Sequence, residues 1–302
     1  MKKIIYIALL AFLSVLCGCT KQEESPVTGD IGEQIYDIYF RRACYTAFDA
    51  NRDGFLSADE AAAAERIEIQ NVRLPIPSPA GLWQPGGYIS CSPLDIAGLQ
   101  FFPHLKFFGY YTDVFGIKSL DLTANTELKE LRIYSEALEK ILLPSPCAIE
   151  RMFLVNGAIT EFTIPASVKS LERINCSELK TLAFAEGSSL KTIEEGCFRS
   201  CYSLKELVFP EGLEVVEKDA FNGNPTLEKV SLPSTVKTLG THALANCGKL
   251  ERLEIHAAVP PAIDRSFEPG SPANKYPIYV PAAALNVYKA AWPEYVWRLK
   301  AL

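Results

Sequence analysis

The stretch AFNGNPTLEKVSLPSTVKTLGTH, residues 220–242, recurs with a period of 23 residues. The flanking stretches 197–219 and 243–265 match it at the same offsets, so apolar residues form five columns over three units. Two of these columns are made of Leu207, Val230 and Leu253, and of Phe209, Leu232 and Ile255. Columns in phase over three units are typical of a solenoid, in which each repeat buries its apolar face against its neighbours.

Toward the N-terminus the units are less regular, but the Leu-x-x-Leu-x-Leu skeleton continues at steps of 20 to 25 residues. Its positions there are Leu182, Phe162, Ile141 and Leu120. A second apolar ladder lies about half a turn away, through Phe108, Leu131, Met152, Leu171, Ile193, Val216 and Leu239. Two ladders per coil predict a flattened repeat solenoid of the α/β type with strands stacked in parallel. We favour the ladder of Leu120, Leu207 and Leu253 as the concave sheet.

Because side chains alternate along a strand, the residues between the buried positions of this ladder point outward. This candidate ligand face consists of Asp121, Leu142, Thr163, Ala183, Val208, Ser231 and Glu254. It has no charge cluster, and the net charge of the chain is -6 with scattered lysines and arginines. Without a basic stripe to neutralise phosphates, nucleic acid is not an expected partner.

Residues 220–239 resemble the BspA-like leucine-rich repeat of bacterial surface proteins, and the resemblance extends over roughly residues 95–302. The segment 279–292, YVPAAALNVYKAAW, is similar to the closing segment of such proteins and predicts a short strand and a capping helix that ends near Pro293. The resemblance implies a right-handed leucine-rich-repeat solenoid over 95–260, a C-terminal cap over 261–302, and a role in adhesion to host or matrix.

The N-terminus has the features of an export signal. Lys2 and Lys3 precede an apolar run, residues 4–16, which is too short to span a bilayer. The stretch LCGC, residues 16–19, resembles the bacterial lipobox, so residues 1–18 are expected to be a lipoprotein signal peptide and Cys19 the lipidated first residue. The acidic stretch TKQEE that follows is similar to the tag of lipoproteins exported to the surface, and residues 19–34 are expected to be a flexible tether. A plain cleaved signal peptide is the alternative.

Before the repeats, the stretch DANRDGFLSADE, residues 49–60, matches every position of the EF-hand calcium loop. Apolar residues at helical spacing precede it, so residues 35–73 predict a helix-loop-helix. The expected Ca2+ ligands are the side chains of Asp49, Asn51, Asp53, Ser57 and Glu60, with the carbonyl of Phe55. The sequence has no second loop, and a single loop is expected to bind weakly. The alternative is a loop that keeps its shape through hydrogen bonds alone.

Residues 74–94 are rich in proline and glycine and predict a long irregular loop. Within it, Trp83 and Tyr88 are a possible aromatic platform for a sugar or peptide. The alternative is that Trp83 packs the loop onto the first coil, because large aromatic residues usually serve packing.

Nine cysteines raise the question of disulfides in an exported protein. With Cys17 removed and Cys19 acylated, seven remain, and an odd number argues against a complete disulfide framework. Cys176, Cys201 and Cys247 each stand three residues before a leucine of the repeat, which favours small buried hydrophobic residues over metal ligands or nucleophiles.

The sequence predicts a binding protein and not an enzyme. His104, His242 and His256 fall in no catalytic or metal-binding motif, and His242 and His256 are expected on the surface. We expect a lipid-anchored outer-membrane protein that faces outward, contacts the membrane only through its lipid, and binds an extracellular protein through the repeat face. Two alternatives stay open: a glycan-binding lipoprotein that uses Trp83, Tyr88, Tyr110 and Tyr111, and a structural envelope protein without a dedicated ligand.

Overall fold

The computed structural model describes residues 29–70, 72–77, 83–91, 95–112, 116–267 and 276–302. The expected signal peptide and Cys19 lie outside these ranges. The chain forms two compact units: a first unit of residues up to 128 with 132–146, and a second unit of 129–131 with 147–302. Within the described ranges, no helix is both long and apolar enough to cross a membrane.

The first unit begins with three short helices: η1 (Ile31–Gln34), α1 (Ile38–Phe48) and α2 (Ala58–Ala62). Helix α1 starts at Asp37, whose carboxylate accepts the backbone N–H groups of Tyr39 and Phe40 at 2.9 Å each. Its apolar side buries Phe48 against Phe102, with ring centroids 5.3 Å apart. Residues 31–34, which the sequence placed in a flexible tether, are therefore helical.

Strand β1 (Arg66–Gln70) pairs in parallel with β4 (Phe107–Thr112), with Ile67 opposite Phe108 and Ile69 opposite Tyr110. The second helix of the expected helix-loop-helix thus ends at Ala62, and a solenoid strand begins four residues later. The repeat region starts before residue 95, where the sequence placed it. The first unit also contains η2 (Leu99–Phe101) and the parallel pair of β5 (Ser119–Asp121) and β7 (Lys140–Leu142), while β6 (Glu130–Ser135) has residues in both units.

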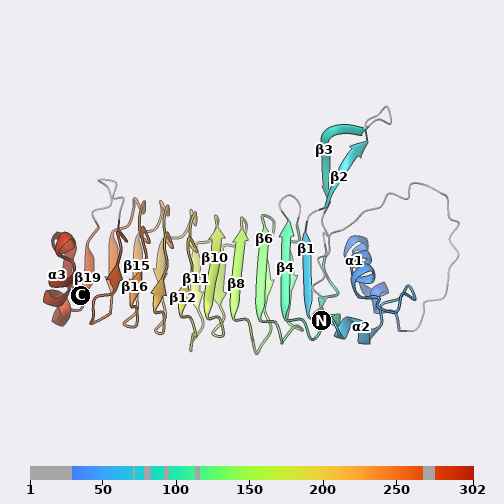
Figure 1. Ribbon diagram of the computed structural model, residues 1–302, viewed down its shortest axis with the longest axis horizontal. Helices are drawn as coiled ribbons and strands as arrows, with labels where there is room; N and C mark the ends of the chain where they lie inside the picture. Colours follow the sequence, from blue (N-terminus) through green and yellow to red (C-terminus); the bar gives the residue numbers. More distant parts are fainter. Residues whose placement is uncertain (1–28, 71, 78–82, 92–94, 113–115, 268–275) are drawn as a thin grey trace. The chain divides into compact units, whose positions relative to one another are not determined.

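The prolines and glycines of residues 74–94 do not make an irregular loop. Strands β2 (Val72–Pro77) and β3 (Trp83–Cys91) form an antiparallel two-stranded ribbon (Figure 1). The register pairs Pro75 with Tyr88 and Pro77 with Trp83, so the Gln-Pro-Gly-Gly stretch between these two positions of β3 is accommodated as a bulge. A bulge absorbs residues that have no partner, which is why turn-forming residues are compatible with pairing here.

In the second unit, the strands of each sheet lie side by side and in parallel (Figure 1). One sheet has the order β8-β10-β12-β14-β16-β18 and is built from the second ladder. These strands are β8 (Arg151–Asn156), β10 (Ser170–Cys176), β12 (Thr192–Ile193), β14 (Val215–Val216), β16 (Thr238–Leu239) and β18 (Ala262–Ile263).

The ladder that we favoured as the concave sheet is divided into separate sheets. In the second unit it gives the pair β9–β11 and the five-stranded sheet β13-β15-β17-β19-β20. Its strands are β9 (Glu161–Ile164), β11 (Thr181–Phe184), β13 (Glu206–Val208), β15 (Lys229–Leu232), β17 (Arg252–Ile255), β19 (Ile278–Val280) and β20 (Leu299–Ala301). The interruption lies between β11 and β13, where the step from Leu182 to Leu207 is 25 residues.

The inward columns predicted from the repeat are confirmed. Leu207, Val230 and Leu253 are 0% exposed, and in the next column Leu232 and Ile255 are also fully buried. Phenylalanines fill the space between the coils, and the rings of Phe198 and Phe221 stack with centroids 5.5 Å apart. Such pairs add about 0.5–1.5 kcal/mol each to the free energy of unfolding beyond their buried area.

The repeat cysteines are buried thiols, as their place in the repeat predicted. The Sγ atom of Cys201 donates to the carbonyl of Ile174 at 3.0 Å, and that of Cys247 donates to Phe221 at 3.2 Å. Each bond reaches the preceding coil. Burial raises the pKa of both thiols to about 11, so neither is a reactive thiolate near neutral pH.

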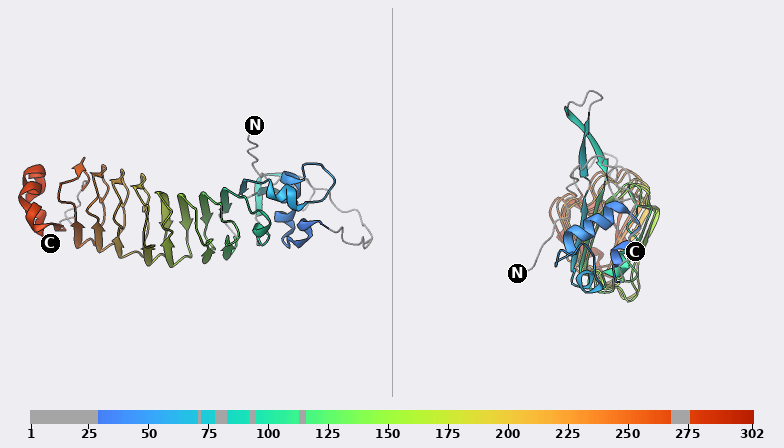
Figure 2. Two further views of the ribbon diagram at one scale, coloured as in Figure 1. Left: turned by 90° about the horizontal axis from the view of Figure 1, so that it is seen from below. Right: turned by 90° about the vertical axis from the view of Figure 1, so that its right-hand side faces the viewer.

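The second unit ends in a cap of η3 (Ala282–Ala284), α3 (Leu285–Ala291) and η4 (Pro293–Arg298), with α3 at the end of the stack of coils (Figure 2). The rings of Tyr288 and Trp292 lie edge to face at 4.9 Å, and Tyr288 donates to the carbonyl of Ala257 at 2.9 Å. The helix ends at Ala291, just before Pro293, so the predicted capping helix is confirmed. Apolar residues of the last coil are thereby shielded from water.

Candidate functional site

The loop of residues 49–60 is shaped by its own side chains. Asn51 accepts the N–H of Asp53 at 2.9 Å, and Asp53 accepts the N–H of Phe55 at 2.9 Å. Arg52 and Gly54 have φ angles of 61° and 87°, so the backbone turns sharply at both. The Gly54 N–H donates to Oδ2 of Asp49 at 3.0 Å, which draws the first position of the loop toward the sixth.

Glu60 closes the loop at its other end. Its Oε1 accepts the N–H of Ala50 at 2.8 Å, and its Oε2 accepts the N–H and the hydroxyl of Ser57 at 3.0 and 2.9 Å. Ser57 in turn caps α2 by accepting the N–H of Glu60 at 3.3 Å. The hydrogen bonds from Ser57 are the main reason that the pKa of Glu60 is lowered from its ordinary value.

The donor set of this loop fits a hard cation. All six expected ligands offer oxygen, and Oδ1 of Asp49 is buried without a hydrogen-bond partner among the described residues. An open pocket of about 620 Å³ lies beside it, lined by Asp49, Glu60 and Arg66 among others. In the described part of the chain, no group of three or more His, Cys, Asp or Glu side chains is gathered as a preformed metal cluster. Glu60 instead binds backbone N–H groups of the loop.

One residue that supports the loop was not found from the sequence. Oδ1 of Asp30 accepts the N–H of Leu56, the eighth residue of the loop, at 3.1 Å. The two residues are 26 positions apart, and the only local signal at Asp30 is that of a helix cap, because the same oxygen accepts the N–H of Gly32 at 2.8 Å. A contact at such a separation has no signature in a single sequence.

The expected ligand face is exposed at most of its positions. Register places Asp121 opposite Leu142 in the first unit, and in the second unit it places Thr163 opposite Ala183 and aligns Val208, Ser231 and Glu254. Val208 is 51% exposed, but Ser231 is only 6% exposed and Glu254 is also largely covered. Ser231 lies beneath His256, whose Nε2 is 3.1 Å from its Oγ. The neighbouring long side chains account for the low exposure of Ser231 and Glu254.

Charged and aromatic side chains form a connected patch on β13-β15-β17-β19, which we call the β17 patch. Lys229 bridges Glu206 at 2.9 Å and Glu254 at 3.7 Å, and Arg252 pairs with Glu254. The Arg252 guanidinium also lies 3.9 Å from the ring centroid of Tyr279. Burial alone would raise the pKa of Glu254, but the hydrogen bond from Arg252 and the charge of Lys229 lower it.

The aromatic residues considered for glycan binding have different environments. Tyr110 is fully buried, and its hydroxyl accepts the N–H of Ile117 at 3.1 Å, so it is not available as a platform. Tyr111 is half-buried. Trp83 and Tyr88 belong to β3, and their side chains lie outside the described part of the structure.

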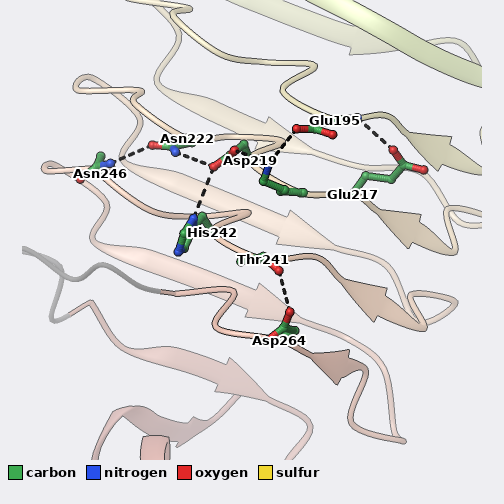
Figure 3. Close-up of polar contacts among 9 residues, drawn as sticks. Glu195, Glu217, Asp219, Asn222, Thr241, His242, Asn246 and Asp264 are labelled. Carbon is green, nitrogen blue, oxygen red and sulfur yellow. Dashed lines mark hydrogen bonds and ion pairs between the residues drawn. The ribbon is translucent and has the colours of Figure 1, made fainter.

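A second polar cluster occupies successive turns of the second unit (Figure 3). Asp219 and His242 have φ angles of 55° and 56°, and their side chains approach to 3.8 Å. Asn222 donates to Asp219 at 2.7 Å, and Thr241 donates to Asp264 at 2.7 Å. The contacts of Asp219 with His242 and of Thr241 with Asp264 link successive coils, whereas Asn222 binds Asp219 within one turn. All three histidines lie at the surface, as expected for His242 and His256.

Comparisons with known proteins identify the repeat. Residues 147–269 match the family described as "BspA type Leucine rich repeat region", in six copies. No curated protein matches the chain.

Among solved structures, a leucine-rich repeat protein from Bacteroides ovatus is 16% identical over 67% of this chain and 61% of its own, with a TM-score of 0.33. One from Eubacterium ventriosum is 14% identical over 59% of this chain and 66% of its own, with a TM-score of 0.27. The pneumococcal vaccine antigen PcpA is 16% identical over 65% of this chain and 72% of its own, with a TM-score of 0.25. The chain therefore spans less than two thirds of the length of the first two structures. From the six matched copies and the parallel coils that they form, residues 147–269 are a leucine-rich-repeat region of the BspA type.

Proposed function

We propose that this protein is an exported, lipid-anchored binding protein without enzymatic activity, and that the β17 patch of its repeat region binds a protein ligand. The observation that supports this most is the network of Glu206, Lys229, Glu254, Arg252 and Tyr279. Charged groups that hold one another in place lose little side-chain entropy when a partner binds. Arginine and tyrosine are also the residue types that dominate binding energy at protein interfaces.

The patch favours a protein over a glycan. Its outward residues belong to neighbouring strands, with Ser231 opposite Glu254 and Glu254 opposite Tyr279, so they form a continuous surface. Tyr279 is covered on one face by the Arg252 guanidinium, which leaves less of the ring for stacking on a sugar. Val208, half-exposed in the same row, adds an apolar contact beside the charges.

The test is a binding screen with residues 20–302 on arrays of matrix proteins and of glycans. We expect a protein hit that Tyr279→Ala weakens at least about tenfold, as hot-spot residues do. Tyr202→Ala is the matched control, because Tyr202 is 53% exposed and lies outside the β17 patch. A glycan hit that neither variant changes would instead favour the glycan-binding alternative and direct attention to Trp83 and Tyr88.

We also propose that the loop of residues 49–60 binds Ca2+ through Asp49, Asn51, Asp53, Phe55, Ser57 and Glu60. Support comes from the twelve-position match and from the buried, unpartnered Oδ1 of Asp49 in the described structure. A bound calcium ion would supply a positive charge that joins the two ends of the loop. An affinity on the order of 10⁻⁴ to 10⁻³ M is expected, which suits an extracellular module.

Calorimetry with CaCl2 tests the calcium proposal. Glu60→Gln should abolish binding at millimolar calcium, and Asp59→Asn should not, because Asp59 is the neighbouring carboxylate outside the expected ligand set. Calcium should also raise the melting temperature of the wild type, since a ligand that binds only the folded state stabilises it. Absence of both heat and a melting shift for the wild type would contradict the proposal.

A further inference from the structure

The eighth residue of the loop, Leu56, is held from outside the loop by residues 30 and 31. Asp30 accepts the Leu56 N–H at 3.1 Å, and the Ile31 N–H donates to the Leu56 carbonyl at 3.0 Å. The two bonds make a short bridge along one edge of the loop. The sequence has no second calcium loop that could pair with this edge, and residues 30 and 31 take that position instead.

Asp30 is itself fixed from two sides. The hydroxyl of Tyr45, on α1, donates to Oδ2 of Asp30 at 2.5 Å, and Oδ1 accepts the N–H of Gly32 at 2.8 Å. The close approach of the tyrosine depends on glycine at position 32, since a Cβ there would lie 2.4 Å from the tyrosine oxygen. The carboxylate is thus oriented by helix α1 and by η1 before it meets the loop.

The hydrogen bond from Leu56 has a consequence for its neighbour Phe55. The Leu56 N–H and the Phe55 carbonyl belong to one planar trans peptide, so they point in opposite directions. A carboxylate that holds the N–H on the outer edge of the loop therefore directs the carbonyl away from that edge, toward the loop interior. The Phe55 carbonyl is the one backbone ligand expected in the calcium loop.

We propose that Asp30 is a positioning residue for calcium, which presets the Phe55 carbonyl without contacting the ion. This inference rests on the proposed calcium function of the loop. Without Asp30, part of the binding energy must order the Phe55–Leu56 peptide, and affinity falls accordingly. The typical net contribution of one hydrogen bond corresponds to about a fivefold to tenfold change in the dissociation constant.

The experiment measures calcium affinity by calorimetry for the wild type, Asp30→Ala and Asp37→Ala. Asp37 is the matched control, because it is also a helix-capping aspartate of the first unit and accepts backbone N–H groups both of its own helix, from Tyr39 and Phe40, and of a distant segment, from Asp95 at 3.4 Å. Both variants should lower the melting temperature in EDTA. Only Asp30→Ala should weaken calcium binding, by about fivefold to tenfold.

Two further measurements test the proposal even if Asp30→Ala fails to fold. Tyr45→Phe removes only the hydroxyl that orients Asp30 and should weaken calcium about twofold to threefold, as loss of part of one hydrogen bond does. In the wild type without calcium, hydrogen exchange should already show a protected Leu56 amide, and Tyr45→Phe should reduce that protection.

The outcomes separate this inference from the calcium proposal. If the wild type binds calcium and Asp30→Ala binds it equally well, or if both aspartate variants weaken binding equally, Asp30 has no positioning role while the calcium site stands. If the wild type binds no calcium, both proposals are wrong. Selective loss of affinity in Asp30→Ala, with Asp37→Ala unchanged, supports the positioning role.

Discussion

The side-chain amide of Asn224 donates to the carbonyl oxygens of Phe198 and Phe221, at 2.7 Å each, and so ties two successive coils together. Its Oδ1 accepts the N–H of Cys201 at 2.9 Å, and the residue is 1% exposed. In the neighbouring coils, Cys201 and Cys247 occupy the same place in the repeat and donate through sulfur. A single buried side chain thus satisfies three backbone groups that have no access to water.

This geometry predicts a graded response at position 224. Asn224→Ala should lower the free energy of unfolding by about 2–4 kcal/mol, because it leaves buried donors and acceptors unpaired. Asn224→Cys should cost less than half as much, since a thiol can still donate to the preceding coil. Urea unfolding measures both, and equal losses for the two variants would show that the polar bonds do not determine stability here.

The buried column that contains Leu207 leads to a second prediction, and the next residue, Val208, provides the control. Leu207→Ala should cost about 2–5 kcal/mol, because Leu207 is fully buried and its truncation leaves a cavity. Val208→Ala should change stability by less than about 0.5 kcal/mol, since Val208 is half-exposed on the outer side of the same strand. Similar costs at the two positions would contradict the alternation of β13.

Two glycines eight residues apart, Gly240 and Gly248, should respond in opposite directions to alanine. A Cβ at Gly240 would lie 2.5 Å from the backbone nitrogen of Lys218 in the preceding coil, whereas nothing lies within 4 Å of a Cβ at Gly248. Gly240→Ala should therefore destabilise by about 1–3 kcal/mol through overpacking. Gly248→Ala should be neutral or stabilise by up to about 1 kcal/mol. Thermal melts of both variants test the spacing between coils.

The β17 patch predicts a pH dependence through Glu254. The pKa of this residue in the folded protein lies below its ordinary value of 4.5, so the ionised form favours the folded state. Its stabilising contribution is present above that ordinary value and is lost as the pH falls through the lowered folded pKa. Glu254→Gln should therefore be less stable than the wild type near neutral pH, and the difference should shrink as the pH falls below 4.5. A constant difference across this range would exclude the ion pairs as its cause.

A substitution at Cys19 tests the proposed lipid anchor. Cys19→Ser should abolish incorporation of a lipid label and move the protein from the membrane to the soluble fraction, because acyl chains supply the membrane affinity. Cys17→Ser is the matched control, since Cys17 lies within the expected signal peptide. An unchanged membrane fraction for Cys19→Ser would contradict lipid anchoring through this residue.

The sequence predicted the features that depend on the period of the repeat and on the alternation of side chains along each strand. The burial of Leu207, Val230 and Leu253 and the buried thiols of Cys201 and Cys247 follow from positions that recur every 23 residues. Contacts between long side chains on a strand surface have no such period, so the burial of Ser231 beneath His256 was not predictable. The ribbon was missed because prolines and glycines usually end strands, whereas here a bulge accommodates those between Trp83 and Tyr88.

For the candidate calcium site, too, the local pattern was predictable from the sequence and the contacts between distant residues were not. The spacing from Asp49 to Glu60 is a local pattern that a single sequence displays in full. The support that the loop receives from Asp30 and Tyr45 depends on how α1 and η1 fold back upon it. Such contacts join residues that are distant along the chain, and no periodic or local signal marks them.

The ribbon of β2 and β3 has a consequence for how the protein avoids unwanted association. A two-stranded ribbon has two open edges, and open edges recruit strands from other molecules into aggregates. Pro75 and Pro77 in β2 and Pro85 in β3 have no N–H group to donate to an added strand. The same prolines that resemble loop residues in the sequence therefore interrupt the hydrogen-bonding capacity of these edges. A two-stranded ribbon can in this way keep its open edges without recruiting further strands.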